Sequence, residues 1–118
     1  GFEMGVVTSK MHALAWRGLQ VVGAAPYLGC LIGADDCAKH KPDPAPILLG
    51  CERMGAQPEE CVYVGDSPFD IAAGNAAGCK TIAVTWGMFC EEELAVENPT
   101  AIIHEVAELA AAIRMLSN

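Results

Sequence analysis

Two aspartates follow the end of a short apolar run in the stretch CVYVGDSPFDIAAGNAAG, residues 61–78. Asp66 comes directly after the glycine that ends the run, and Asp70 lies four residues later, one turn into a predicted helix. Ligands of an open parallel sheet bind at the carboxyl ends of its strands. Paired carboxylates at that edge suit a hard cation such as Mg²⁺, which prefers oxygen ligands and keeps some waters. The same two residues could instead be helix N-terminal acids favoured by the helix dipole.

A hydroxyl, backbone amides and a lysine could bind an anion at the same edge. Thr8 and Ser9 follow the first predicted strand, where a hydroxyl and N–H groups suit phosphate oxygens. Lys41 is the nearest cation that a loop could bring in as a point charge. The plainer interpretations are a helix cap for Thr8 and Ser9 and a solvated loop lysine for Lys41. Asp35 and Asp36 are interpreted as exposed turn residues, and the three histidines as surface or core residues.

Charge and composition limit the partners of the chain. The 118 residues carry 7 Lys and Arg against 15 Asp and Glu, which gives a net charge of −8. This field repels nucleic acid and anionic membranes, so we expect neither as a partner. A phosphorylated small molecule would need local cations, a metal or backbone N–H groups. The hydrophobic fraction of 53% is typical of a globular domain.

The six cysteines indicate a reducing compartment. None forms a C-x-x-C pair, and no Cys/His cluster has the spacing of a zinc site. We therefore expect free thiols in a cytoplasmic protein. We see no secretion signal, and no apolar run approaches the 18 residues typical of a membrane span.

Short apolar runs alternate with helical patterns along the whole chain. Strands are predicted at residues 4–7, 30–33, 61–64, 81–85 and 101–103. Helices are predicted at 10–22 with Ser9 as cap and Leu14 and Val22 on one face, at 44–54, at 67–78, at 91–96, and from about 102 to the end. This regular alternation indicates an α/β fold, a Rossmann-like parallel sheet with helices on both faces.

The motifs VVTSK, KHKPDPAPILL, VYVGDSPFDIAAGNAAG and KTIAVTWG, in this order, resemble the haloacid dehalogenase (HAD) superfamily. The similarity is to its phosphoglycolate phosphatase and pyrophosphatase-like branch, and it extends from Met4 to about Leu116. It implies that residues 1–118 are the C-terminal part of a HAD-like hydrolase core domain.

The resemblance also implies a role for each candidate residue. Thr8 corresponds to the family's hydroxyl that binds the transferring phosphoryl group, with the Ser9 amide beside it. Lys41 corresponds to the lysine that neutralises the nucleophile and the phosphoryl oxygens, so Thr8 and Lys41 are the expected catalytic residues.

The metal side of the site is implied in the same way. Asp66 corresponds to the family's ligand for Mg²⁺, and Asp70 to the companion carboxylate of the metal site. Ser67 is expected to help through an outer contact.

One family motif is missing. Family members attack phosphorus with an aspartate of an early D-x-D motif, whose second aspartate is the general acid/base, and this chain has no D-x-D. The resemblance implies that the family's first strand, its nucleophile and the cap would precede Gly1. That absent central strand would lie between the strand ending at Val7 and the strand ending at Val64. We favour a fragment of a longer phosphatase over a whole chain that has lost catalysis, because the substrate-side motifs are intact.

The resulting expectation is a Mg²⁺-dependent phosphomonoester hydrolase for a small phosphorylated metabolite such as phosphoglycolate. It would act through an aspartyl-phosphate on an aspartate outside this segment, so the segment alone should be inactive. The alternatives are a sugar phosphomutase of the same superfamily and a non-catalytic module that binds phosphate or a partner protein. A strand missing from the sheet would leave two backbone edges open, so we also expect self-association through these edges.

Overall fold

The computed structural model describes residues 2–117 and has the predicted α/β alternation. The strands are β1 (Met4–Val7), β2 (Leu28–Ile32), β3 (Val62–Gly65), β4 (Lys80–Val84) and β5 (Ala101–Ile103). The helices are α1 (His12–Val21), α2 (Ala45–Met54), α3 (Pro68–Ala77), α4 (Glu91–Ala95) and α5 (Leu109–Leu116). None of the helices between residues 2 and 117 has both the length and the apolar character needed to cross a membrane.

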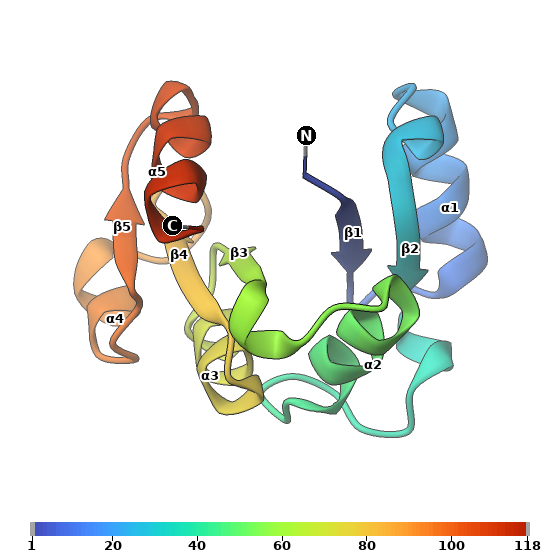
Figure 1. Cartoon of the computed structure of the whole chain (residues 1–118), viewed down its shortest axis with the longest axis horizontal. Helices are drawn as coiled ribbons and strands as arrows, with labels where there is room; N and C mark the ends of the chain where they lie inside the picture. Colours follow the sequence, from blue (N-terminus) through green and yellow to red (C-terminus); the bar gives the residue numbers. More distant parts are fainter. Residues whose placement is uncertain (1, 118) are drawn as a thin grey trace.

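The strands form two separate parallel sheets, and this division decides the architecture. β1 pairs with β2, and β3, β4 and β5 pair in that order. Within the described residues β1 and β3 are not paired with each other, so each has one free edge, and Figure 1 shows the two strands standing apart in the middle of the molecule. This is the predicted parallel α/β fold, with its sheet interrupted between β1 and β3.

Helix packing joins the two sheets. α2 lies against β1 and β2, α3 lies against β3 and β4, and the two helices contact each other (Figure 1). Their interface is a buried apolar cluster made of Ile47, Cys51, Ala73, Ala77 and Cys79. A second cluster, around Ile82, Val84 and Ile103, packs against α5. The first cluster therefore sets the position of one half of the molecule relative to the other.

Local capping signals account for the elements that flank the predicted site. The Ser67 side chain accepts a hydrogen bond from the Asp70 amide at the start of α3, and Gly78 ends this helix with φ = +93°. The Asp43 carboxylate accepts from the Ala45 amide at the start of α2, and Gly55 ends that helix with φ = +68°. Left-handed φ values of this kind favour glycine, which makes both helix ends readable from the sequence.

The prediction for α1 was wrong at its start and on its buried face. The helix begins at His12 and has no side-chain cap, because the chain is still extended at Met11. The nearby hydroxyl that accepts a local N–H is that of Thr8, which binds the Lys10 amide at 3.2 Å. Leu14 is 62% exposed, so the apolar spacing did not mark a fully buried face.

Candidate active site

A lysine–aspartate ion pair joins the loop before α2 to the first turn of α3. Lys41 Nζ lies 2.7 Å from Asp70 Oδ1, and each side chain is only 13% exposed. Lys41 Nζ also donates to the backbone carbonyl of Val7 at 3.4 Å, at the end of β1. Burial acts to lower the pKa of Lys41, but the hydrogen bond and charge of Asp70 outweigh it, and the pKa is raised. The ammonium group is therefore charged at neutral pH.

Both oxygens of the Asp70 carboxylate have partners. Oδ1 accepts from Lys41, and Oδ2 accepts from the Ser67 hydroxyl at 3.1 Å. The close approach of Asp70 to β3 requires a glycine at position 65, because a Cβ there would lie 2.3 Å from the Cβ of Asp70. Ser67 thus makes the contact with Asp70 that an outer residue of the site would need.

Asp66 differs from Asp70 because its side chain is unengaged. It follows β3, is exposed, and makes no side-chain hydrogen bond or ion pair with residues 2–117. The turn after β4 passes close to it, since a Cβ on Gly87 would lie 2.6 Å from Asp66 Oδ2. The carboxylate of Asp66 is free to accept a ligand from solvent.

The donor set can be compared with what Mg²⁺ requires. Residues 2–117 bring together no group of three or more His, Cys, Asp or Glu side chains able to hold a metal. Mg²⁺ is usually bound through one or two carboxylates together with water and substrate phosphate, and not by a complete protein cage. The free Asp66, with Asp70 one turn along α3, fits this donor set.

Thr8 and Ser9 lie at the end of β1, next to Val7, whose carbonyl accepts from Lys41. The Thr8 amide donates to the Ile32 carbonyl at 2.9 Å, which fixes the backbone at this point. The Ser9 amide makes no hydrogen bond within the described chain. Because Lys41 reaches the Val7 carbonyl, the structure brings Lys41, Asp70 and the β1 terminus together. Asp66 is not joined to them by a direct contact.

A tyrosine in this region was missed in the sequence. The Tyr63 hydroxyl accepts from Lys41 Nζ at 3.2 Å and donates to the Val7 carbonyl at 3.4 Å. Burial raises the pKa of Tyr63, so the hydroxyl keeps its proton at neutral pH. Its position inside an apolar strand pattern is typical of a core aromatic residue, and no spacing rule distinguishes it.

A second polar cluster, made of His12, Asp35 and Asp36, lies at the end of β2 and shows that the Asp36 side chain is not fully exposed as predicted. The imidazole of His12 lies 2.5 Å from the Asp36 carboxylate, which also accepts from the Gly33 amide at 2.7 Å. The Asp35 carboxylate accepts from the His12 amide at 2.7 Å. The hydrogen bonds from Gly33 and His12 lower the pKa of Asp36. Asp35 is exposed, as expected, whereas Asp36 is half-buried, and together they bind the start of α1 more than 20 residues away in sequence.

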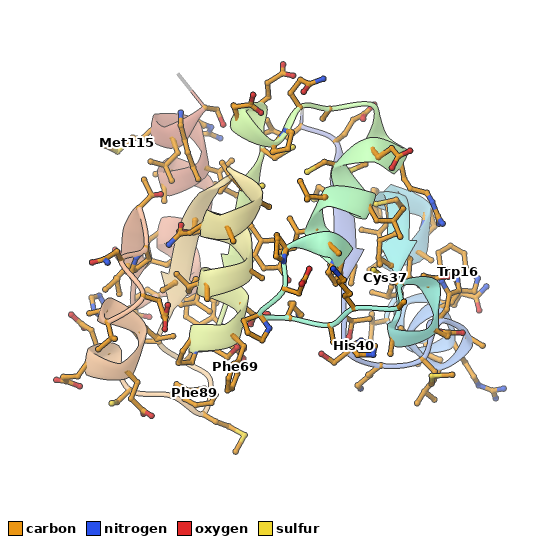
Figure 2. All side chains as sticks on the ribbon, turned by 90° about the horizontal axis from the view of Figure 1, so that it is seen from below. Trp16, Cys37, His40, Phe69, Phe89 and Met115 are labelled. Atoms are coloured by element: carbon orange, nitrogen blue, oxygen red, sulfur yellow. The ribbon has the colours of Figure 1, made fainter. Side chains whose placement is uncertain are left out.

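The candidate site lies apart from two hollows in the described part of the chain. The hollows have volumes of about 470 and 360 Å³, and Leu28, Gly29 and Arg53 line both of them. Neither is lined by the residues around Lys41. Figure 2 shows the molecule from below, with His40 on the loop that carries Lys41. Phe69 and Phe89 lie together, with ring centroids 6.5 Å apart in an edge-to-face arrangement.

The comparison with known protein families assigns this architecture. Residues 1–84 match the model of the haloacid dehalogenase-like hydrolases. The chain belongs to this family. The family resemblance seen in the sequence is therefore confirmed, and the α/β fold agrees with it.

Individual relatives lie in the branch that the sequence indicated. The chain is 35% identical to the pyrophosphatase PpaX of Bacillus pumilus, over 96% of the chain and 52% of the relative. It is 36% identical to the phosphoglycolate phosphatase of Escherichia coli, over 96% and 45%. A crystal structure of a predicted phosphoglycolate phosphatase from Haemophilus somnus superposes with a TM-score of 0.87 at 28% identity, over 95% of this chain and 50% of that one. The chain spans about half the length of the curated relatives it matches.

Proposed function

We propose that this chain is the phosphoryl- and metal-binding part of a Mg²⁺-dependent phosphomonoester hydrolase. The observation that carries the proposal is the buried ion pair of Lys41 with Asp70, fixed at the end of β1 and beside the free edges of both sheets. The nucleophilic aspartate would come from a strand outside residues 1–118. The substrate would be a small phosphorylated metabolite such as phosphoglycolate.

Each candidate site residue has a defined role in this proposal. The Thr8 hydroxyl and the unbonded Ser9 amide would bind phosphoryl oxygens. Lys41 would hold its positive charge beside the phosphoryl group and the attacking carboxylate, where negative charges meet. The attack would form a bond between the carboxylate oxygen and phosphorus and break the ester bond, and the alcohol would leave with a proton. Water would then hydrolyse the acyl phosphate.

Asp66 would hold Mg²⁺, with Asp70 supporting the site from α3. When bound, the ion would offset charge on the phosphoryl oxygens. Asp70 also has a task of its own, because its carboxylate holds the Lys41 ammonium group in place. The two aspartates would therefore have different roles: the free Asp66 would bind the metal, and the engaged Asp70 would position Lys41.

The function is tested by p-nitrophenyl phosphate hydrolysis with and without Mg²⁺. We expect no turnover from the chain alone, and Mg²⁺-dependent turnover when an upstream segment carrying the family's D-x-D strand is added. A complex that assembles but stays inactive with Mg²⁺ would contradict the proposal. Turnover by the chain alone would place the nucleophile within these 118 residues and refute that part of the account.

Asp66→Asn is expected to weaken Mg²⁺ binding without affecting the fold. Removing the charge of a direct ligand should reduce affinity by at least the roughly 10- to 100-fold that follows loss of an outer partner of a metal ligand. The free energy of unfolding should change by no more than about 0.5 kcal/mol, because the exposed carboxylate has no partner to lose. An amide NMR titration of the chain with Mg²⁺ measures the affinity, and urea denaturation measures the free energy of unfolding. Glu59→Gln, an exposed acid on another part of the surface, is the control. Equal Mg²⁺ affinity in Asp66→Asn and the wild type would remove Asp66 from the metal site.

We also propose that the isolated chain pairs the free edges of β1 and β3 with a second copy. Unpaired backbone N–H and C=O groups on a strand edge favour pairing with another chain. Light scattering after size-exclusion chromatography should give a mass above the 12.4 kDa of one chain. A stable monomer across the concentration range would contradict this proposal. It would also be contradicted if substitutions far from β1 and β3 abolished association while substitutions on these two strands did not.

A further inference from the structure

Two side chains connect the two sheets where their strands are not paired. The Tyr63 hydroxyl, on β3, donates to the carbonyl of Val7, the last residue of β1. The same hydroxyl accepts from Lys41 Nζ, which itself donates to Val7. One phenol oxygen therefore contacts the end of the first sheet and the candidate catalytic lysine together.

The ring that carries this hydroxyl is held by the core. Tyr63 packs against the buried cluster between α2 and α3, whose members are Ile47, Cys51, Ala73, Ala77 and Cys79. The absence of a side chain at Gly74 makes room for it, because a Cβ there would lie 3.2 Å from Cδ2 of the ring. A tyrosine has two side-chain torsions, so a wedged ring leaves the hydroxyl little freedom to move.

The contacts of Lys41 divide into a charged one and two neutral ones. Asp70 supplies the charge, while the Tyr63 hydroxyl on β3 and the Val7 carbonyl on β1 supply neutral acceptors, one from each sheet. An ion pair with Asp70 alone would fix the ammonium group relative to α3 only. Acceptors from β3 and β1 are needed to fix it relative to Thr8, which follows Val7 directly.

We propose that Tyr63 is a positioning residue that sets the distance between the Lys41 ammonium group and the β1 terminus. This rests on the proposed function, because it assumes that Lys41 and Thr8 bind one phosphoryl group. The hydroxyl spaces the two anion-binding elements before the ligand arrives, which lowers the cost of ordering them. A tyrosine that served only the core would need the ring and not this hydroxyl.

The test uses Tyr63→Phe, which keeps the ring and removes one oxygen. The matched control is Tyr27→Phe, since Tyr27 is 73% exposed and is the only other tyrosine in the chain. The first readout is the proton-exchange rate of the Lys41 ammonium group, measured by NMR on lysine-labelled chain. The second is the affinity for inorganic phosphate, measured by amide shifts. Loss of one hydrogen bond to a charged group should speed exchange and weaken phosphate binding roughly 5- to 10-fold.

The two readouts separate this inference from the proposed function. Unchanged Lys41 exchange in Tyr63→Phe, with a native amide spectrum, would overturn the positioning role. Faster exchange would support it, and phosphate binding by the wild type tests the function independently. Should Tyr63→Phe fail to fold, wild-type chain labelled with 3-fluorotyrosine gives two ¹⁹F signals. Lys41→Met should then shift the signal of Tyr63 and leave that of Tyr27 in place, and two unmoved signals would overturn the proposal.

Discussion

Lys41→Met is expected to lower the free energy of unfolding of the chain by about 3 kcal/mol, because it leaves the Asp70 carboxylate buried without its cation. Both side chains are only 13% exposed, so water solvates the orphaned carboxylate much less than it does in the unfolded chain. Because the pKa of Lys41 is raised, the stabilisation that its charge gives to the pair is retained from neutral pH to about pH 10.4, the unfolded value, and is lost as the pH rises through the folded value. Urea denaturation at pH 7 therefore measures the whole effect.

A second substitution separates the structural part of this loss from the catalytic part. Asp70→Asn in the Lys41→Met background removes the orphaned charge, so most of the stability should return, to within about 1 kcal/mol of the wild type. Phosphatase activity of the assembled enzyme should not return, because the charge opposite the phosphoryl group is still missing. We expect turnover to stay lower by about 10³-fold, the scale of losing one preorganised charge-stabilising group. A double variant that regains activity would show that Lys41 serves the fold alone.

The local part of the fold could be predicted because its signals are short in range. Ser67 and Gly78 mark the ends of α3, and the residues of β5 were identified without error. Glycine and capping side chains act on the backbone within a few residues, so they can be read from the chain directly. The start of α1 was misplaced because Ser9 was taken as its cap, whereas the helix begins at His12 without a side-chain cap and the Thr8 hydroxyl accepts the Lys10 amide.

The site could be predicted only in part because its contacts are long in range. Lys41 and Asp70 are 29 residues apart, and no periodicity joins them. The family resemblance named both residues, but it did not indicate that they bind each other while Asp66 stays free. Tyr63 was missed because a tyrosine in an apolar strand is normally interpreted as a core residue. Its contact with Lys41 depends on the path of the loop before α2, which the sequence does not show. The contacts of Asp36 with His12 are hidden for the same reason.

Gly65→Ala is expected to disrupt the site more than any other single-methyl change near it. The added Cβ would lie 2.3 Å from the Cβ of Asp70 and 2.8 Å from its Cγ. A Cβ moves only with its backbone, so side-chain rotation cannot relieve this overlap, and the first turn of α3 must shift away from β3. We expect a loss of about 2 to 3 kcal/mol in the free energy of unfolding, the upper range for overpacking. Urea denaturation measures it, and the Lys41 ammonium signal reports whether the pair with Asp70 survives.

Gly18→Ala is the matched control, because it makes the same chemical change where no atom lies within 4 Å. Gly18 lies inside α1, where alanine is the better helix former, so this variant should gain up to about 1 kcal/mol. Both substitutions change the backbone entropy in the same way. Opposite signs of their effects on the free energy of unfolding would therefore separate steric conflict from backbone entropy. Should Gly65→Ala be as stable as the wild type, with slow exchange at Lys41, α3 could move on β3 without cost. The rigid link from β3 through Asp70 to Lys41, on which the proposed positioning of the lysine depends, would then be refuted.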